Sequence, residues 1–425
     1  MSALSGSHLV NAILMGAMFG VWEAVIIAKK LNVVMGFVSP VRLIAWLIFV
    51  VSLFGCTRTK ISSGQIDEKN IVQINVTDQE INLNEFSSQL SIHSLIHLET
   101  TRESVFGEPT KVRIVDSILY VFCHSLQDVL MFSPRGRFLH KLDRKGKGPH
   151  EYLDLRDFQV YKDQVIAVLT YNKIMYYDSK LKHASTYNLG IKNNSKIYLN
   201  PTQFHEENKF YYLWNGTVAW ENTRDRLAYL MYTSKNEQIL KGYFPVTGKV
   251  ISNIKFSESE KSVLINPTFG SNLVYRINND KLDALYRIDF GKRNPPEKIL
   301  KEIGANNNQQ LIIDLKNSNY CLNIGNVLET TNYLYFQFSQ YGIIKQGLYS
   351  KRTRSCKIGK LNPITKIECI DGDLLVALVQ PIYLRDIIKN LDNMNLNLEI
   401  KELFSNLDFN NDENPIVVKY IIDPF

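Results

Sequence analysis

A glycine-rich segment, Gly146-Lys147-Gly148-Pro149, is the first place where this sequence could do chemistry, because glycines let backbone N–H groups approach a phosphate. A P-loop needs GK[ST] at the start of a helix, and a dinucleotide-binding fingerprint needs GxGxxG between a strand and a helix. Here Pro149 interrupts the series, and strand-like sequence follows it. We therefore interpret the segment as a structural corner between strands.

Oxygen-bearing side chains near the C-terminal end alternate in the manner of a calcium-binding loop; they are Asp408, Asn410, Asp412 and Asn414. Such a loop needs glycine at its sixth position for a sharp turn and a bidentate glutamate at its twelfth. This chain has Glu413 and Lys419 at those positions. A solvated loop is the better interpretation.

Two histidines and three carboxylates are the remaining candidate ligand or acid–base residues. His93 and His97 are four residues apart, so on one strand they would face the same side and could share a ligand. Glu151, Asp154 and Asp157 could supply acid and base groups, although capping of turn amides is a commoner use of such residues. No GxSxG and no HExxH motif is present. We expect no catalytic residue, no cofactor and no metal.

The five cysteines do not form a metal site, because none of them lies in a CxxC pair: they are Cys56, Cys123, Cys321, Cys356 and Cys369. With Cys56 set aside, the remaining four could pair in up to three ways in an oxidising compartment. Buried free thiols are the favoured alternative, because free cysteine behaves as a small hydrophobe.

Composition indicates a globular, strand-rich chain without a nucleic-acid partner. Of the 425 residues, 45% are hydrophobic and 21% are charged, which allows a sizeable core, and the 22 Tyr and 21 Phe favour strands. The net charge of +7 is scattered over the sequence. Its densest cluster, Arg135 to Lys147, is typical of a solvated turn rather than of a basic binding stripe.

A recurring hairpin pattern must position all of these residues. Each copy has an alternating strand, a turn rich in Ser, Pro, Asp, Asn, Lys or Gly, and a second alternating strand; the copies lie at 129–142, 174–189, 227–244, 273–290 and 345–361. Further apolar pairs precede them, as at 158–169 and 327–338. The turns are spaced by about 45, 55, 45 and 75 residues, near the period of propeller blades with insertions.

These units predict an all-β fold, a six-bladed β-propeller of four-stranded antiparallel blades over residues 71–425. Segments 369–379 and 414–422 would complete the sixth blade together with N-terminal residues, and this closure leaves no long exposed edge. Two strand-like segments between residues 71 and 100 precede the first unit. Short helices are expected as insertions at 296–303, 383–391 and 396–407.

The first 55 residues predict targeting. Residues 43–55 are an apolar run preceded by Arg42 and followed by Cys56, which is the order of a signal peptide. The tetrapeptide Leu53-Phe54-Gly55-Cys56 resembles a bacterial lipobox, in which the cysteine is lipidated and becomes the first residue of the mature protein. Residues 57–70 are polar and patternless and predict a tether.

A second apolar stretch, residues 9–28, leaves two interpretations open. Translation could start at Met35, which would give a short basic leader before the apolar run. Alternatively, both apolar runs could span a membrane as a hairpin with Lys29, Lys30 and Arg42 on the cytoplasmic side. Both interpretations place the bulk of the chain outside the cytoplasm.

From Phe132 and Gly136 through Gly146, Gly148, Pro149, Glu151 and Tyr152 to Asp157-Phe158, the chain resembles the six-bladed β-propeller lipoproteins of Bacteroidetes, relatives of the NHL-type propellers. The resemblance extends over most of residues 70–425. It implies a structural role for these motif residues and says little about activity.

The expected function is therefore a lipid-anchored cell-envelope module, facing the periplasm from the outer membrane, which binds a protein, peptide or glycan at one mouth of the ring. Its membrane contact would be the lipid anchor, and no nucleic acid is expected as a partner. The alternative is an envelope enzyme, a lyase or hydrolase, with a cluster of His, Arg and Asp at the channel mouth.

Overall fold

The structure is a computed structural model of the chain. It describes residues 62–76, 86, 89–171, 173–189, 201–208, 210–214, 228–234, 239–245, 256–258, 262–266, 270–279, 281–306, 309–360, 366–381, 383 and 413–425. The chain divides into two compact units, Met1–Thr59 and Lys60–Phe425, and every described residue belongs to the second. The predicted signal segment, Cys56, the start at Met35 and most of the segment 408–414 that alternates like a calcium-binding loop lie outside the described residues.

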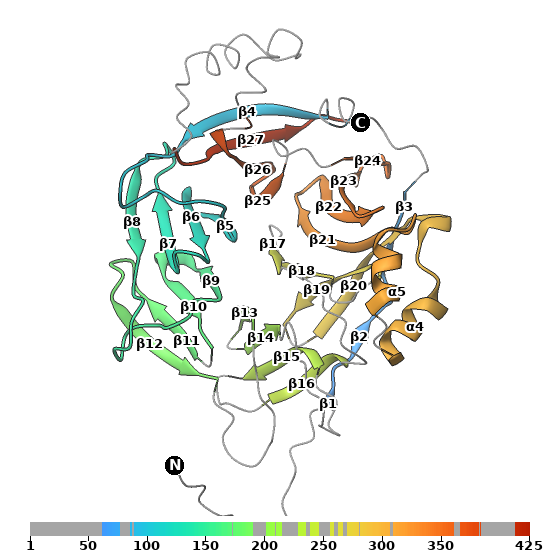
Figure 1. The fold of residues 1–425 in the computed structure, drawn as a ribbon, viewed down its shortest axis with the longest axis horizontal. Helices are drawn as coiled ribbons and strands as arrows, with labels where there is room; N and C mark the ends of the chain where they lie inside the picture. The colour runs from blue at the N-terminus through green and yellow to red at the C-terminus, as the bar shows by residue number, and fades with distance from the viewer. Residues whose placement is uncertain are drawn as a thin grey trace, which may run out of the picture. The chain divides into compact units, whose positions relative to one another are not determined.

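The described strands form six sheets arranged around a centre as a β-propeller (Figure 1). The first sheet contains β5 (Lys111–Val115), β6 (Ile118–Cys123), β7 (Asp128–Phe132) and β8 (Phe138–Leu142). The second contains β9 (Asp157–Val160), β10 (Ile166–Leu169), β11 (Lys173–Tyr177) and β12 (His183–Asn188). The third contains β13 (Gln203–Glu207), β14 (Phe210–Trp214), β15 (Ala228–Ser234) and β16 (Ile239–Pro245).

The remaining three sheets follow the same order of strands. The fourth contains β17 (Ser257–Glu258), β18 (Val263–Ile265), β19 (Leu273–Asn278) and β20 (Lys281–Asp289). The fifth contains β21 (Leu322–Glu329), β22 (Tyr333–Gln340), β23 (Ile343–Ser350) and β24 (Cys356–Lys360). The sixth contains β25 (Ile367–Asp371), β26 (Leu374–Val379), β27 (Ile416–Ile422) and β4 (Leu90–His97).

All five predicted hairpins are confirmed, and each is the outer pair of strands of one sheet: β7–β8, β11–β12, β15–β16, β19–β20 and β23–β24. The predicted closure of the last sheet by N-terminal residues is also confirmed, because β4 pairs antiparallel with β27 from Leu90↔Ile422 to His97↔Ile416. The two strand-like segments before the first hairpin do not pair with each other. The earlier one, β3 (Val72–Asn75), joins β20 instead.

Short N-terminal strands run along the outside of the third and fourth sheets. β1 (Ser62–Ser63) pairs parallel with β16, and β2 (Ile66–Asp67) and β3 pair parallel with β20. The polar sequence of residues 62–70 did not predict these contacts. They form because the outermost strand of each sheet leaves an unpaired row of backbone groups that another strand can cover. We call residues 62–76 the outer strap.

The core lies between neighbouring sheets, and so both faces of most inner strands are buried. β10 is an apolar run, Ile166–Leu169, in which every residue is buried. Residues of the first and second sheets share one apolar cluster, which includes Phe122, Phe158 and Tyr177. This double-sided burial explains why second strands such as β10 and β26 are continuous apolar runs, while an outermost strand such as β20 alternates.

Helices are few in the described part of the chain. α4 (Glu297–Asn306) confirms the helix expected at 296–303, and α5 (Gln309–Lys316) follows it in the same connection between β20 and β21. Two single turns of 3-10 helix, η1 (Lys162–Gln164) and η2 (Gly291–Arg293), complete the set. None of these helices combines the length and the apolar content that crossing a bilayer requires. The other two expected helices lie outside the described residues, apart from the start of the first.

The four described cysteines are free thiols, as the favoured alternative predicted. Cys123, Cys321 and Cys369 are buried and Cys356 is half-buried. Burial raises the pKa of the Cys123 thiol to about 12, with a further contribution from the nearby Asp128 charge, and burial also raises the pKa of Cys356 to about 12. Protonated, buried thiols of this kind are inert and pack as small apolar groups.

Candidate functional site

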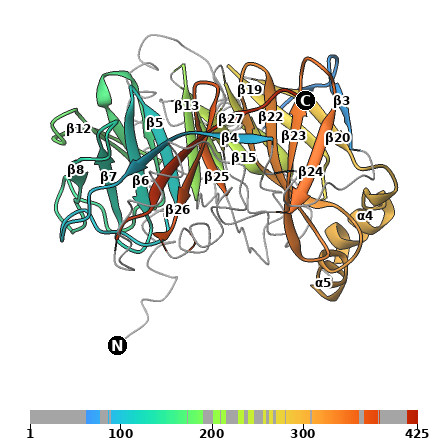
Figure 2. The same ribbon diagram turned by 90° about the horizontal axis from the view of Figure 1, so that it is seen from above.

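The two ends of the blades are built from different connections. In an antiparallel sheet traced strand by strand, the loop between the second and third strands lies at the same end as the link to the next sheet. The innermost strands β5, β9, β13, β17, β21 and β25 begin at this end, which we call the mouth face. Figure 2 shows α4 and α5, which belong to one of these links, projecting at one end of the blades. The turns between the two innermost strands of each sheet lie at the opposite face.

Exposed apolar side chains gather on the mouth face. Nine of the eleven large apolar side chains that are exposed in the described residues belong to its connections, or to the first two residues of β23 beside them: Val105, Leu126, Leu153, Tyr171, Ile313, Tyr341, Ile343, Ile344 and Tyr383. Of the other two, Val72 lies in β3 of the outer strap and Ile421 lies in β27, which β4 covers on its outer side. Single exposed apolar residues are normal, but their confinement to one face is typical of an interaction surface.

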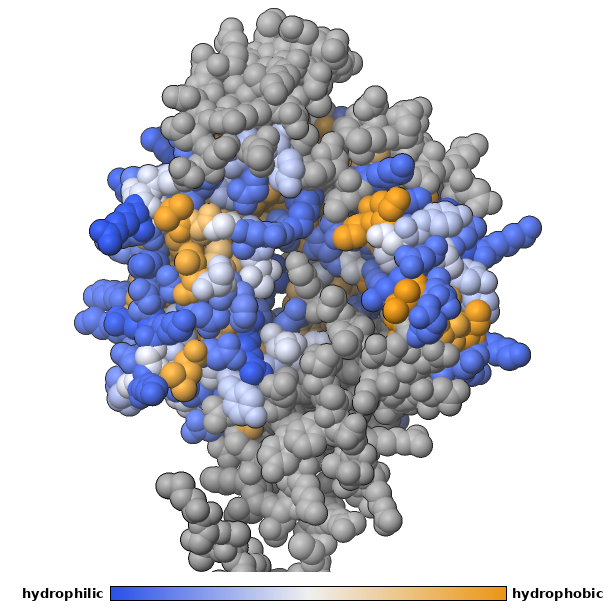
Figure 3. Space-filling view, viewed as in Figure 1, coloured by the Kyte–Doolittle hydropathy of each residue, from blue (hydrophilic) through white to orange (hydrophobic). Residues whose placement is uncertain are grey.

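The most prominent of these apolar points is the hairpin that links β22 to β23. Tyr341 is 55% exposed, and Ile343 and Ile344 are 47% and 50% exposed. The hairpin is held in place by α5, because the backbone N–H groups of Tyr341 and Gly342 donate to the carbonyls of Ser318 and Lys316, at 3.0 and 2.8 Å. Figure 3 shows apolar groups as separate patches around the ring, with hydrophilic groups between them.

A small cavity lies at the centre of the mouth face. Its volume is about 80 Å³, and its charged lining residues are Lys111, Arg113, Arg156, Asp157 and Glu368. This volume is well below the 300 Å³ or more of a typical small-molecule pocket, although it can hold ordered water. The centre of the ring therefore suits only a small group presented by a larger partner.

Hydrogen bonds between neighbouring innermost strands fix this cavity. Asp157 is buried; its carboxylate accepts from Lys111 Nζ at 2.7 Å and from the backbone N–H of Phe204 at 3.0 Å. Gln203 repeats the arrangement one sheet further on, where its Oε1 accepts from the N–H of Phe256 at 2.9 Å. Asp157, a candidate acid or base in the sequence, thus links three sheets, and both of its carboxylate oxygens accept hydrogen bonds in that role.

The side chain of Arg113 crosses the central channel. It is 6% exposed, and its Nη2 donates to the carbonyl of Phe256 at 3.2 Å, across the ring from the first sheet to the fourth. Its Nη1 donates to the carbonyl of Val112 at 2.9 Å. A buried guanidinium with carbonyl partners on both sides of the channel is a structural crossbar that keeps large ligands out of the interior.

The glycine-rich corner has the structural geometry that its sequence predicts. The Glu151 carboxylate accepts from the N–H of Gly148 at 2.8 Å, and a side chain on Gly146 would collide with that carboxylate. Tyr152 is fully buried; its hydroxyl donates toward the carbonyls of Gln127 and Leu142 and accepts from the N–H of Arg144. The motif residues thus bond to one another, and the corner presents no cradle of open N–H groups.

The fold requires a glycine at position 136. Its φ is +79°, and a Cβ at this position would overlap the carbonyl oxygen of His97. Its carbonyl accepts from the N–H of Glu99 at 2.8 Å, and the Glu99 carboxylate accepts from the N–H of Phe138 at 2.8 Å. The outer turn of the first sheet is thereby fastened to the chain that leaves β4, where the ring closes.

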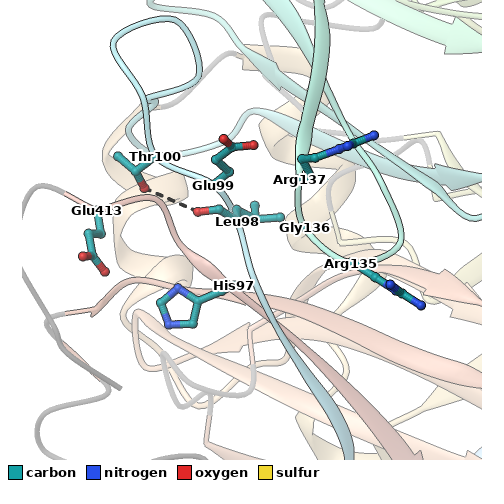
Figure 4. Close-up of a pocket in the computed structure, with 8 residues that line it drawn as sticks. All are labelled: His97, Leu98, Glu99, Thr100, Arg135, Gly136, Arg137 and Glu413. Atoms are coloured by element: carbon teal, nitrogen blue, oxygen red, sulfur yellow. Dashed lines mark hydrogen bonds between the residues drawn. The ribbon is translucent and has the colours of Figure 1, made fainter. Parts of the chain in front are cut away.

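A shallow hollow of about 400 Å³ lies at this closure, lined by His97, Leu98, Glu99, Thr100, Arg135, Gly136, Arg137 and Glu413. Figure 4 shows Arg135 and Arg137 extending away from Glu413 and His97. Because these charged groups diverge, the hollow does not gather them on one reacting atom. We place the candidate site at the mouth face instead.

The predicted histidine pair does not gather ligands in the described residues. The register between β4 and β27 shifts at His93, where Ile92 and Ser94 pair with consecutive partners, so the strict alternation that would align His93 with His97 is interrupted. Within the described part of the chain, no group of three or more His, Cys, Asp or Glu side chains could hold a metal ion.

The end of the segment that alternates like a calcium-binding loop is buried, so the solvated loop expected there is wrong at Asn414. Asn414 is fully buried; its Oδ1 accepts from the N–H of Phe106, and its Nδ2 donates to the carbonyls of Glu99 and Ser104, all at 2.9 Å. It joins the start of β27 to the chain between β4 and β5. Asp154 forms an ion pair with Arg156 at 2.7 Å, so the three carboxylates Glu151, Asp154 and Asp157 have three separate structural uses.

Asp128, at the mouth-face end of β7, was not singled out by sequence reasoning. Burial, and then the Asp143 charge, raise its pKa to about 6, although Lys141 and Lys145 oppose the shift. Lys141 Nζ is 3.9 Å from the Asp128 carboxylate. No pattern along the sequence could reveal this carboxyl, because its pKa depends on neighbours that only the folded sheet supplies.

Asp128→Asn is expected to stabilise the protein at pH 7.5 by about 1–3 kcal/mol. The folded-state pKa lies above the unfolded value of 3.8, so the stability that protonated Asp128 contributes is present below about pH 4 and is lost as the pH rises through about 6. Denaturant unfolding at pH 4 and pH 7.5 measures the effect. A variant less stable than the wild type at pH 7.5 would contradict this assignment.

Three solved structures are similar to this chain to different degrees. A protein of Bacteroides fragilis NCTC 9343, provisionally named an exported protein, is similar with a TM-score of 0.66 and 17% identity, covering 84% of this chain and 100% of that one. A DUF4221 family member from Bacteroides vulgatus ATCC 8482 has a TM-score of 0.48, 10% identity and coverage of 78% and 97%. PorZ, a surface component of the type-IX secretion system of Porphyromonas gingivalis, has a TM-score of 0.30, 8% identity and coverage of 64% and 29%.

Only the first similarity is strong enough to support the propeller fold, and it shows the fold alone. None of the curated proteins matches the sequence. The family described as "Domain of unknown function (DUF4934)" matches residues 69–420, which include strands of all six sheets and, from the outer strap, β3.

Proposed function

Because the chain belongs to the DUF4934 family, whose range covers the ring described above, we propose that it is a six-bladed, lipid-anchored propeller of the cell envelope that binds a macromolecular partner across its mouth face. The observation that carries this proposal is the confinement of exposed apolar side chains to that face. The partner is a protein, a peptide or a glycan, and each of the six sheets is one blade.

The size of the central cavity favours a large partner. A ligand held by the ring alone would have to fit into about 80 Å³, with Arg113 crossing the channel behind it. A partner that spans the mouth face would instead cover Tyr171, Tyr341 and the neighbouring apolar points together, and could place one small group in the cavity. Aromatic residues at such positions contribute strongly to protein interfaces.

Two observations support an envelope location: the predicted lipobox, and the similarity to the Bacteroides fragilis protein that is provisionally named an exported protein. The outer strap begins at Ser62, six residues after Cys56, and so a lipidated Cys56 would lie within about 20 Å of the third blade. A single acyl chain anchors weakly, so stable attachment would depend on the several chains of a bacterial lipoprotein. We propose that the ring faces the periplasm from the outer membrane.

Site-specific photocrosslinking in intact cells tests the proposal. A crosslinking residue at Tyr171 or Tyr341 is expected to give a discrete adduct, whereas His140 and Ser185, exposed on the outermost strands β8 and β12, serve as matched controls and are expected to give none. Equal crosslinking at all four positions would contradict a binding role for the mouth face.

Negative charges introduced into the same surface are expected to prevent formation of the crosslinked adduct. Ile343→Asp combined with Ile344→Asp should lower the yield at Tyr341 about tenfold or more, because burying unpaired carboxylates in an apolar contact costs more than about 1.4 kcal/mol. Both side chains are about half exposed, so the fold is expected to tolerate the change. An unchanged adduct would exclude this hairpin from the contact.

The enzyme alternative has no observation in its favour. The described mouth face holds Arg113, Arg156 and Asp157, but their polar groups bond to carbonyls, a backbone N–H and neighbouring side chains of the ring. His205 bonds with Gln159 at 2.8 Å and packs against Phe256. We do not propose a catalytic role for these residues.

A further inference from the structure

The glycine-rich corner, residues 143–152, packs against the outer hairpin of the second sheet, β11–β12, and this contact gathers cationic side chains. The Nη2 of Arg144 donates to the carbonyl of Leu181 at 3.3 Å, and the Nζ of Lys173 donates to the carbonyl of Glu151 at 3.1 Å. Each bond holds a cation of one element against the backbone of the other. We call four side chains of this contact the corner cluster: Arg144, His150, Lys173 and His183.

The two imidazoles of the corner cluster stack on each other. The ring centroids of His150 and His183 are 4.3 Å apart, with an interplanar angle of 29°. The Nε2 of His183 lies 2.7 Å from the hydroxyl of Thr186, and the ring of Tyr177 meets His183 edge-on. The Tyr177 hydroxyl also donates to the carbonyl of His150 at 3.1 Å, so the stack is fixed on both sides. The ring of His150 itself is exposed and forms no hydrogen bond with a described residue.

Positive charge converges on this stack. Burial, and then the charges of His150 and Lys173, lower the pKa of His183, although a backbone hydrogen bond with Ser185 opposes the shift. Repulsion between neighbouring cationic groups costs free energy. An anion that binds among these groups removes this cost, and it favours the protonated form of the imidazoles.

The carboxylates of the two elements do not balance the charge. Glu151 accepts from the N–H of Gly148, Asp178 accepts from two N–H groups of its own turn, and Asp143 lies 3.5 Å from the Nζ of Lys141. Four further cations of the two elements are exposed, and none forms an ion pair with a described residue: Lys145, Lys147, Lys180 and Lys182. Cations that are scattered in the sequence are therefore gathered on one surface of the fold.

We propose that the corner cluster binds a tetrahedral oxyanion, a phosphate or sulfate ester carried by a larger molecule. A guanidinium offers paired N–H donors to such a group, and an ammonium adds a compact charge. The backbone of the corner does not form the cradle, because its motif residues bond to one another. The cluster shares no residue with the central cavity, so this inference stands without the partner proposed for the mouth face.

Calorimetric titration of the full-length protein, extracted from membranes with detergent, tests the site with three sugars: glucose 6-sulfate, glucose 6-phosphate and unmodified glucose. Both esters are expected to bind with dissociation constants on the order of 1 mM, and glucose is expected not to bind. The ester that binds more tightly at pH 7 identifies which of the two groups the natural ligand carries. Esters that bind no more tightly than glucose would overturn the proposal.

The pH dependence separates the two esters. Affinity for glucose 6-sulfate is expected to rise about tenfold from about pH 8 to about pH 5.5, because the imidazoles take up protons while the charge of the sulfate ester stays constant. The rise for glucose 6-phosphate should be smaller, because a phosphate ester has a second pKa of about 6 and loses charge in the same range. His150→Phe keeps an aromatic ring on His183, and it should remove most of the rise while leaving the affinity at about pH 8 unchanged.

Charge-removing variants locate the binding site. Arg144→Gln combined with Lys173→Gln is expected to lower the affinity for both esters about tenfold or more, and Arg144→Gln alone, at an exposed position, about threefold. Lys298→Gln with Lys301→Gln, on exposed positions of α4, is the matched control and should change neither affinity. A double variant at Arg144 and Lys173 that binds the esters as well as the wild type would contradict the assignment.

Discussion

Gly136→Ala is expected to destabilise the propeller by about 3–5 kcal/mol, a large part of the stability of an ordinary domain. The residue has φ of +79°, which costs an L-residue about 1–2 kcal/mol. The larger cost is steric, because the new methyl group would overlap the carbonyl oxygen of His97 and would push the outer turn of the first sheet away from β4. Denaturant unfolding of wild type and variant measures the loss.

Gly372→Ala is the matched control for backbone strain. Gly372 also has a positive φ, +58°, in the turn between β25 and β26, but a Cβ there would meet no atom within 4 Å. This variant is expected to lose only about 1 kcal/mol. Equal losses for the two variants would mean that strain alone matters at Gly136 and that its contact with His97 does not hold the ring closed.

Cys56→Ala is expected to abolish lipidation completely. The wild-type protein extracted from membranes should have the mass of an acylated chain that begins at Cys56, because the lipobox-like tetrapeptide predicts cleavage before that residue. The variant should lack the acyl mass and keep the residues that precede position 56. Intact mass spectrometry of both proteins measures the difference.

Cys123→Ala is the control for this measurement, since the Cys123 thiol is buried in the first sheet and is expected to carry no lipid. That variant should keep the acylated mass apart from the change of side chain. A wild-type chain that retains residues 1–55 would overturn the lipoprotein prediction. Residues 9–28 and 43–55 would then have to be treated as membrane spans.

The local pattern of the sequence determined the repeating elements. The five outer hairpins could be predicted because their strands have one solvated face, so polar and apolar residues alternate, and because their turns need residues such as Gly136 and Asp178. The helix at Glu297 could be predicted for a similar reason, since its signals lie within a few residues of one another. Closure of the ring by an N-terminal strand could be predicted because segments 369–379 and 414–422 do not supply all four strands of the last sheet.

Contacts between distant segments could be decided only by the tertiary structure. Asn414 is expected from the sequence in a solvated loop, yet it is fully buried and its hydrogen-bond partners lie about 300 residues away in the sequence. The sequence of Ser62–Asn75 predicts a tether followed by a strand, yet the segment pairs with the outermost strands of two sheets. No local pattern encodes this pairing, because the partners are unpaired backbone groups of distant strands. The mouth face follows the same rule, since Leu126, Tyr171 and Ile343 are isolated residues in sequence and become one surface only when alternate connections meet at the same end of the sheets.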